Sequence, residues 1–347
     1  MTSAVPADLS AHLWETRYRA AGPDGTVDAN LDATWRRVAN ALAAAEPRRR
    51  EHWARAFHGA LADFRFLPGG RILAGAGTRR HVTLLNCFVM GTLGDSLHGI
   101  FRGLAEGALT MQQGGGIGVD FSPLRPRGSR AGASGAIASG PVSFMHIWDS
   151  MCATLLSTGA RRGAMMGTLR CDHPDIEEFV EAKRDGRVLR RFNLSVLVTD
   201  AFMDAVARDE PWPLVHPAKA PGPQGEVVER AWPGQAGPAR CHVYRRVRAR
   251  ALWERIVRAA YACAEPGVLF IDRIQRTNPL AYAEIIAATN PCGEVPLPAY
   301  GACDLGSINL TRFVRAPFTA EAALDLGGVA ELAGVAVRML DDVYDVS

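Results

Sequence analysis

Segments typical of β-strands alternate along this chain with segments typical of amphipathic helices, and this alternation limits the possible folds more than any other feature. The apolar run HVTLLNCFVMG, residues 81–91, is typical of a buried strand. DSLHGIFRGLAEGALTMQQ, residues 95–113, then spaces its apolar residues as a helix does. The same order returns in NLSVLVTDAFMDAVARD, residues 193–209. The sequence therefore predicts the α/β class.

A helical region is predicted before the first strand. Residues 30–65 place apolar residues three and four positions apart, with Asp32 as the expected N-cap and Pro47 interrupting the pattern. The Gly-rich stretch LPGGRILAGAGT, residues 67–78, is predicted to be a loop. The Pro- and Gly-rich residues 217–240 are expected to form a surface excursion.

Composition excludes several classes of protein. Net charge is +3, too small to indicate a nucleic-acid or membrane partner. No apolar run approaches the roughly 20 residues of a membrane span, and the N-terminus lacks a signal-peptide core, so a cytoplasmic location is expected. The cysteines are odd in number, scattered and without a CxxC pair, which favours neither a disulfide scaffold nor a metal site; they lie at positions 87, 152, 171, 241, 263, 292 and 303.

Two glycine-rich segments could approach a ligand. QQGGGIGVD, residues 112–120, lacks both the Walker lysine and GxGxxG spacing, so it predicts only a tight turn where backbones pack closely. STGARRGAMMG, residues 157–167, is a cationic loop that could contact a phosphate or a base, although an ordinary exposed turn fits as well.

The segment NPCGEVPLPAYGACDLGSINL, residues 290–310, is the strongest candidate for chemistry. Cys292 lies between Pro291 and Gly293, where a regular helix cannot form, so a loop or strand tip is expected. In an extended segment Asn290, Cys292 and Glu294 would share one face. They would supply an amide, a thiol and a general base, although a purely structural cluster remains open.

These residues resemble the catalytic segment of the large subunit of ribonucleotide reductases. The resemblance extends over further segments, whose sequences are similar to those of the adenosylcobalamin-dependent class II branch. Among these segments are GGRILAGAGT, NCFVMG, LTMQQGGGIGVDFSPLRPRGS, RRGAMMGTLRCDHPDIEEFVEAK and RMLDDVYDVS. It implies reduction of ribonucleotides to 2′-deoxyribonucleotides for DNA synthesis and repair. It also implies adenosylcobalamin (coenzyme B12) as the radical source.

The resemblance also implies a function for particular residues. Cys292 would become a transient thiyl radical, Glu294 would remove the 3′ hydroxyl proton, and Asn290 would hydrogen-bond the substrate hydroxyls. Cys87 and Cys303 would form the reducing pair, which ends as a disulfide. Substrate contacts are implied for Arg71, Asn86 and Gly116.

The resemblance further implies regulation and partners. The implied binding residues for a deoxynucleotide effector are Asp95, Gln112, Arg125, Arg161 and Arg162, and residues 159–163 would relay effector identity to the substrate base. The implied partners are a ribonucleoside di- or triphosphate, a thioredoxin-like or dithiol reductant and a second copy in a homodimer.

The family fold is a ten-stranded α/β barrel, and family chains run hundreds of residues further. An N-terminal helical domain is therefore expected over residues 1–80 and the first part of the barrel over residues 81–347. A fragment, or one piece of a split enzyme that cannot turn over alone, is expected. Two alternatives remain: a class I large subunit with a separate radical-generating subunit, and a nucleotide-binding module without turnover.

Overall fold

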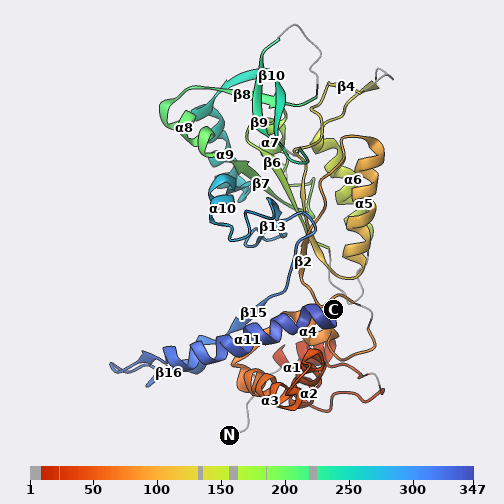
Figure 1. Ribbon diagram of the computed structural model, residues 1–347, viewed down its shortest axis with the longest axis vertical. Helices are drawn as coiled ribbons and strands as arrows, with labels where there is room; N and C mark the ends of the chain where they lie inside the picture. The colour runs from red at the N-terminus through yellow and green to blue at the C-terminus, as the bar shows by residue number, and fades with distance from the viewer. Residues whose placement is uncertain are drawn as a thin grey trace. The chain divides into compact units, whose positions relative to one another are not determined.

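A computed structural model describes residues 9–22, 24–80, 82–131, 136–155, 163–184, 186–218, 225–235 and 237–347. The chain divides into two compact units, which Figure 1 shows in ribbon form. The first unit combines the chain up to Asn86 with Cys303–Ser347, and the second contains Cys87–Ala302. β14 (Ala302–Cys303) lies where the chain passes from the second unit back to the first.

The first unit is mainly helical. Its core joins Trp35 and Leu42 of α2 with Phe57 of α3 and Met339 of α11, all of them buried. The predicted helical region is confirmed, but the N-cap of α2 is Asn30, whose Oδ1 accepts from the Ala33 N–H at 2.9 Å. The helices are α1 (Leu9–Leu13), η1 (Trp14–Tyr18), α2 (Leu31–Leu42), η2 (Ala43–Ala45), α3 (Arg50–Leu61), η3 (Ala62–Phe64), α4 (Gly70–Gly75), η5 (Leu310–Phe313) and α11 (Leu326–Val346).

Two short antiparallel ladders complete the first unit. β1 (Phe66–Pro68) pairs with β15 (Gly306–Ile308), and β16 (Val314–Arg315) pairs with β17 (Ala323–Leu324). The loop predicted over residues 67–78 is wrong in part, because α4 forms within it. Burial of Ile72 and Leu73 in the helical core outweighs the low helix propensity of the surrounding glycines.

The second unit is built on parallel strands in the order β11-β7-β6-β3-β2. Beyond β2 the backbone of Val89 exchanges hydrogen bonds with Tyr300 and Gly301. The strands are β2 (Cys87–Val89), β3 (Gly116–Asp120), β6 (Met165–Arg170), β7 (Phe192–Val198) and β11 (Gly267–Phe270). This arrangement confirms the α/β prediction.

Helices cover one face of this sheet. Ile117, Leu169 and Leu194 point toward these helices and are buried against residues such as Met145 and Trp148 of α6. Strand alternation turns Gly116, Gly118 and Asn193 to the opposite face, hereafter the inner face. These helices are α5 (Leu97–Gln112), α6 (Pro141–Thr154), α7 (Ile176–Glu181), α8 (Asp200–Arg208) and α9 (Ala249–Cys263). A further helix, α10 (Ile271–Thr277), directly follows β11.

The remaining strands lie outside the central sheet. β8 (Pro211–His216), β10 (Pro238–Arg248) and β9 (Val227–Ala231) form a three-stranded antiparallel sheet. Most described residues of the predicted surface excursion, 217–240, are exposed or half-buried, but 227–231 and 238–240 pair with each other as strands. The other ladders are β4 (Arg130–Ala131) with β5 (Ala136–Ile137), and β12 (Ile286–Thr289) with β13 (Pro296–Pro298).

None of the helices in the described part of the chain combines the length and apolarity needed to cross a lipid bilayer.

Candidate active site

A tight turn carries Cys292 between β12 and β13. The Gly293 N–H donates to the Asn290 carbonyl oxygen at 3.0 Å, and Gly293 has a φ of +87°. The Val295 N–H donates to Asn290 Oδ1 at 3.0 Å. The segment is therefore a turn and not an extended strand, so Asn290, Cys292 and Glu294 do not alternate on one face as an extended chain would place them. Asn290 is buried, whereas Cys292 and Glu294 are exposed.

Glycines of β3 let this segment lie directly on the inner face of the sheet. A Cβ on Gly116 would lie 2.7 Å from Cγ of Pro291. A Cβ on Gly118 would lie only 1.8 Å from the carbonyl oxygen of Thr289. The prediction that backbones pack closely at QQGGGIGVD is thus confirmed, and the packing partner is the segment that leads into Cys292.

Asn290 links the turn to the strand that carries Cys87. Its Nδ2 donates to Cys87 Sγ at 3.7 Å, while its Oδ1 accepts from the Val295 N–H. Both ends of the carboxamide are thus engaged, and the side chain is fully buried. The structure therefore brings Asn290, Cys87 and the Cys292 turn together.

The surroundings of Cys292 favour a protonated thiol. Burial, the negative charge of Glu294 and the proximity of Cys87 together raise the pKa of the Cys292 thiol above its usual value of 9.0. At neutral pH Cys292 therefore keeps its S–H bond. A protonated thiol can give up a hydrogen atom, whereas a thiolate cannot.

The Glu294 contribution predicts a measurable change in thiol reactivity. With Glu294→Gln the negative charge is removed, so the pKa of Cys292 falls and more thiolate is present at pH 8. Alkylation of Cys292 by iodoacetamide at pH 8 should accelerate by roughly two- to fivefold, because an exposed charge interaction contributes at most about 1 kcal/mol. Glu254→Gln, which removes the partner of Arg258 on α9, serves as the control. An unchanged Cys292 rate would contradict the effect ascribed to Glu294.

Three predicted site residues belong to the first unit. The Asn86 N–H donates to the carbonyl oxygen of Cys303 at 2.8 Å, and the Cys303 side chain is buried. Oδ1 of Asn86 is buried without a hydrogen-bond partner among the described residues and faces Gly69. Arg71 lies two positions further on, in the first turn of α4. A buried amide oxygen of this kind is a candidate acceptor for a ligand hydroxyl.

The predicted effector residues divide into three groups. Nε of Arg125 donates to Asp95 Oδ2 at 2.9 Å, and the Arg125 N–H donates to Asp95 Oδ1 at 3.0 Å. Gln112 ends α5, whereas Asp95 precedes its N-cap Ser96, so the length of α5, about 24 Å, separates them within one chain. Arg161 and Arg162 lie outside the described residues, as do residues 159 and 160 of the predicted relay loop.

Asn193 lies close to the turn but was not predicted from the sequence. It is exposed on β7, and its Nδ2 donates to the carbonyl oxygen of Pro291 at 2.7 Å. A single asparagine in a strand-like run has no local signature, so only the contact across 98 positions reveals it.

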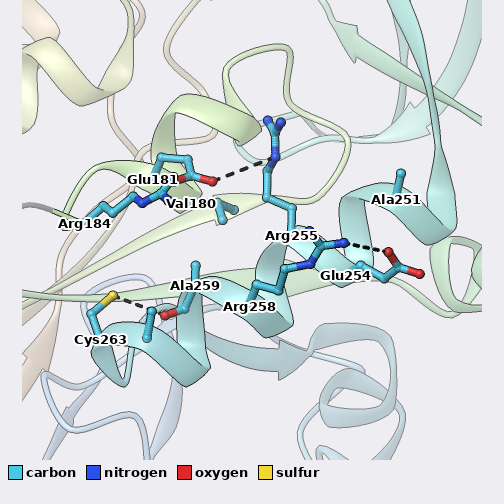
Figure 2. A pocket seen from close by; sticks show the side chains of 10 residues that line it. Val180, Glu181, Arg184, Ala251, Glu254, Arg255, Arg258, Ala259 and Cys263 are labelled. Carbon is cyan, nitrogen blue, oxygen red and sulfur yellow. Dashed lines mark hydrogen bonds and ion pairs between the residues drawn. The ribbon is translucent and has the colours of Figure 1, made fainter.

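A hollow, hereafter the α7–α9 hollow, lies between α7 and α9 and has a volume of about 430 Å³. Figure 2 shows the arginines and glutamates that line it. Arg184 lies 3.2 Å from Glu181, and Arg258 lies 3.0 Å from Glu254. Arg255 also contacts glutamates of α7. Because each arginine is paired with a carboxylate, the hollow offers little net positive charge to an anion.

Comparison with known proteins agrees with this geometry. The family model described as "Ribonucleotide reductase, all-alpha domain" matches residues 5–81, and "Ribonucleotide reductase, barrel domain" matches residues 85–347. The vitamin B12-dependent ribonucleoside-diphosphate reductase of Mycobacterium tuberculosis H37Rv is 42% identical over 318 residues, covering 91% of this chain and 41% of the relative. The protein of the same name from Thermoplasma acidophilum is 38% identical over 297 residues, covering 85% and 35%. The ribonucleoside-diphosphate reductase subunit alpha of Chlamydia muridarum is 27% identical over 327 residues, covering 90% and 30%.

The chain therefore belongs to the ribonucleotide reductase large-chain family. The resemblance stated from the sequence is confirmed, as is a helical N-terminal part followed by barrel sequence. The chain spans about two fifths of the length of the curated Mycobacterium relatives.

Proposed function

We propose that this chain carries the thiol chemistry of a vitamin B12-dependent ribonucleotide reductase, with Cys292 as the residue that becomes the thiyl radical. The observation that carries the proposal is the exposed Cys292 thiol on a turn that packs against the inner face of the sheet. Its raised pKa keeps this thiol protonated at neutral pH. Identity of 42% to a relative named as vitamin B12-dependent, against 27% to a relative named as a subunit alpha, favours this function over the class I alternative.

The proposed reaction uses residues of this chain in sequence. The Cys292 thiyl takes the hydrogen atom from the ribose 3′ carbon, and Glu294 accepts the proton of the 3′ hydroxyl. The 2′ hydroxyl then leaves as water, with a proton from the reducing cysteines. Cys87 and Cys303 supply two electrons and a second hydrogen, which forms the new C–H bond at the 2′ carbon, and become a disulfide. Glu294 returns its proton to the 3′ oxygen. Cys292 finally returns the hydrogen atom to the 3′ carbon and is regenerated as a radical.

Asn290 and Cys87 support this order of events. As Cys87 gives up its proton, negative charge develops on its sulfur, and the Asn290 N–H is already directed at that atom. The proposed contact of Asn290 with the substrate hydroxyls would then add to its contacts with Cys87 and Val295. Asn86, Arg71 and Gly116 are proposed to contact the substrate.

The chemistry of Cys292 fits adenosylcobalamin. When bound, this cofactor would supply a radical through homolysis of its cobalt–carbon bond, and the Cys292 thiol would give up its hydrogen atom to that radical. Such a transfer requires an S–H bond and a sulfur that a bulky group can approach. Cys292 meets both requirements, because its pKa is raised and its side chain is exposed.

The proposals on regulation and binding partners rest on membership of the ribonucleotide reductase family. A deoxynucleotide effector would bind near the Asp95–Arg125 pair, with Gln112, Arg161 and Arg162 as further contacts. A homodimer is proposed, in which Gln112 of one copy need not meet Asp95 of the same copy. The proposed substrate is a ribonucleoside di- or triphosphate, and the proposed reductant is a thioredoxin-like protein or a dithiol. We propose residues 1–80 and 81–347 as the helical and barrel parts.

The test is anaerobic reduction of a ribonucleotide by the purified chain with a dithiol, with and without adenosylcobalamin. Cobalamin-dependent deoxyribonucleotide would support the proposed function and would overturn the expectation that this chain cannot turn over alone. Product that requires a second, metal-containing protein instead of cobalamin would favour the class I alternative. Deoxynucleotide binding by a well-folded chain that forms no product under either condition would favour the module without turnover.

A further inference from the structure

We infer that Asn193 is a positioning residue for Cys292, acting through the carbonyl group of Pro291. Asn193 and Cys292 are 99 positions apart in the sequence, and no motif of the sequence links them. The hydrogen bond from Asn193 Nδ2 to the Pro291 oxygen, at 2.7 Å, joins β7 to the turn. The catalytic meaning of this inference rests on the proposed function, but the geometry does not.

The covalent structure explains why this one bond is enough to fix Cys292. The carbonyl group of Pro291 and the N–H of Cys292 belong to a single planar peptide unit. The proline ring fixes φ of Pro291, so ψ of Pro291 is the soft dihedral that remains between the ring and that plane. Holding the carbonyl oxygen fixes ψ, and with it the direction in which Cys292 leaves the turn.

The two sides of Pro291 are held by different strands. Its ring packs on Gly116 of β3, and its oxygen is held by Asn193 of β7. Met166 of β6 lies between these strands and pairs with Asn193 in register. A Cβ on Gly293 would lie 3.6 Å from Cε of Met166, so the residue after Cys292 also rests on the sheet.

Asparagine suits this position because a carbonyl oxygen only accepts hydrogen bonds. The amide NH₂ of Asn193 provides the donor, whereas an aspartate at this position would provide none. Ser195 lies two residues further along the same strand and the same face. Among the described residues it makes no hydrogen bond to Pro291, whose oxygen accepts from Asn193, and it therefore offers a matched control.

The experiment compares Asn193→Ala, Asn193→Asp and Ser195→Ala in the full chain, with alkylation of Cys292 and hydrogen exchange of residues 290–295 as readouts. The exposed Cys263, which lines the α7–α9 hollow (Figure 2), is the internal reference. In Asn193→Ala the turn should loosen. Cys292 then lies farther from the Glu294 charge and from the groups that bury it, so its pKa, and with it the midpoint of its pH–rate profile, falls. Alkylation at pH 8 and exchange of the Gly293 and Val295 amides should each rise by about three- to tenfold, the factor of one ordinary hydrogen bond.

Asn193→Asp should give at least the same increase, because its carboxylate faces the carbonyl oxygen. Ser195→Ala should stay within about twofold of the unchanged protein, and Cys263 should react at one rate throughout. Unchanged Cys292 reactivity and exchange in both Asn193 variants would overturn the inference, as would an equal change in Ser195→Ala. A loosened turn in a chain without reductase activity would support the inference while the proposed function fails. An active chain whose turn is unchanged in both Asn193 variants would overturn the inference while the proposed function stands.

Discussion

Replacement of Cys292 by alanine should reduce ribonucleotide reduction by at least three orders of magnitude, roughly the loss seen when the group that forms the reactive species is removed. Cys292 provides the S–H bond that gives the radical, and the thiol of Cys87 is bound by Asn290 on the strand below the turn. Cys87 and Cys303, the other thiols assigned to this reaction, would therefore not replace Cys292 as the residue that forms the radical. The measurement is the rate of deoxyribonucleotide formation under anaerobic conditions with adenosylcobalamin and a dithiol.

Two further variants separate chemistry from folding. Cys292→Ser keeps the shape of the side chain, but its O–H bond is too strong to donate a hydrogen atom to a carbon radical, so the same loss is expected. Cys263→Ala removes the other exposed cysteine, on α9, and should retain activity within about twofold. Because Cys292 is exposed, neither substitution at 292 should lower the melting temperature appreciably. Retained activity in Cys292→Ala would contradict the assignment of the radical to this residue.

The sequence predicted the elements whose formation depends on local patterns. α5 follows a 3.6-residue apolar period and begins at Ser96, whose Oγ accepts from the Gly99 N–H at 3.0 Å. α4 and β9 were not predicted, because long-range contacts stabilise both. Ile72 is buried among helices distant in sequence, and β9 forms only by pairing with β10. Local glycine and proline content gave no sign of either contact.

The same distinction applies to the candidate site. The motif around Cys292 identified a thiol next to a base, because those residues are neighbours in the sequence. The burial of Asn290 was not predicted, since it depends on the turn and on Cys87 203 positions away. The glycines of β3 predicted that another backbone segment packs closely on this strand, but not which segment it is. Only the fold shows that this partner is the segment preceding Cys292.

Replacement of Gly118 by alanine tests that close approach, and a large effect is expected. A Cβ at this position would lie 1.8 Å from the carbonyl oxygen of Thr289, far inside van der Waals contact. Gly118 does not have a positive φ, so alanine suits the backbone and the clash alone causes the effect. The free energy of unfolding of the second unit should fall by about 3 kcal/mol, at the upper end for overpacking. Urea unfolding monitored by tryptophan fluorescence measures this change.

The clash can also be relieved if residues 289–295 move off the sheet. In that case part of the stability is kept, but Pro291 loses Asn193 and Gly116, so reductase activity and the slow exchange of the turn are both lost. Gly59→Ala is the matched control, because a Cβ there, in the last turn of α3, meets nothing within 4 Å. It should raise stability by about 0.5–1 kcal/mol through helix propensity. A Gly118→Ala protein that is as stable and as active as the original would show that β3 does not support the Cys292 turn.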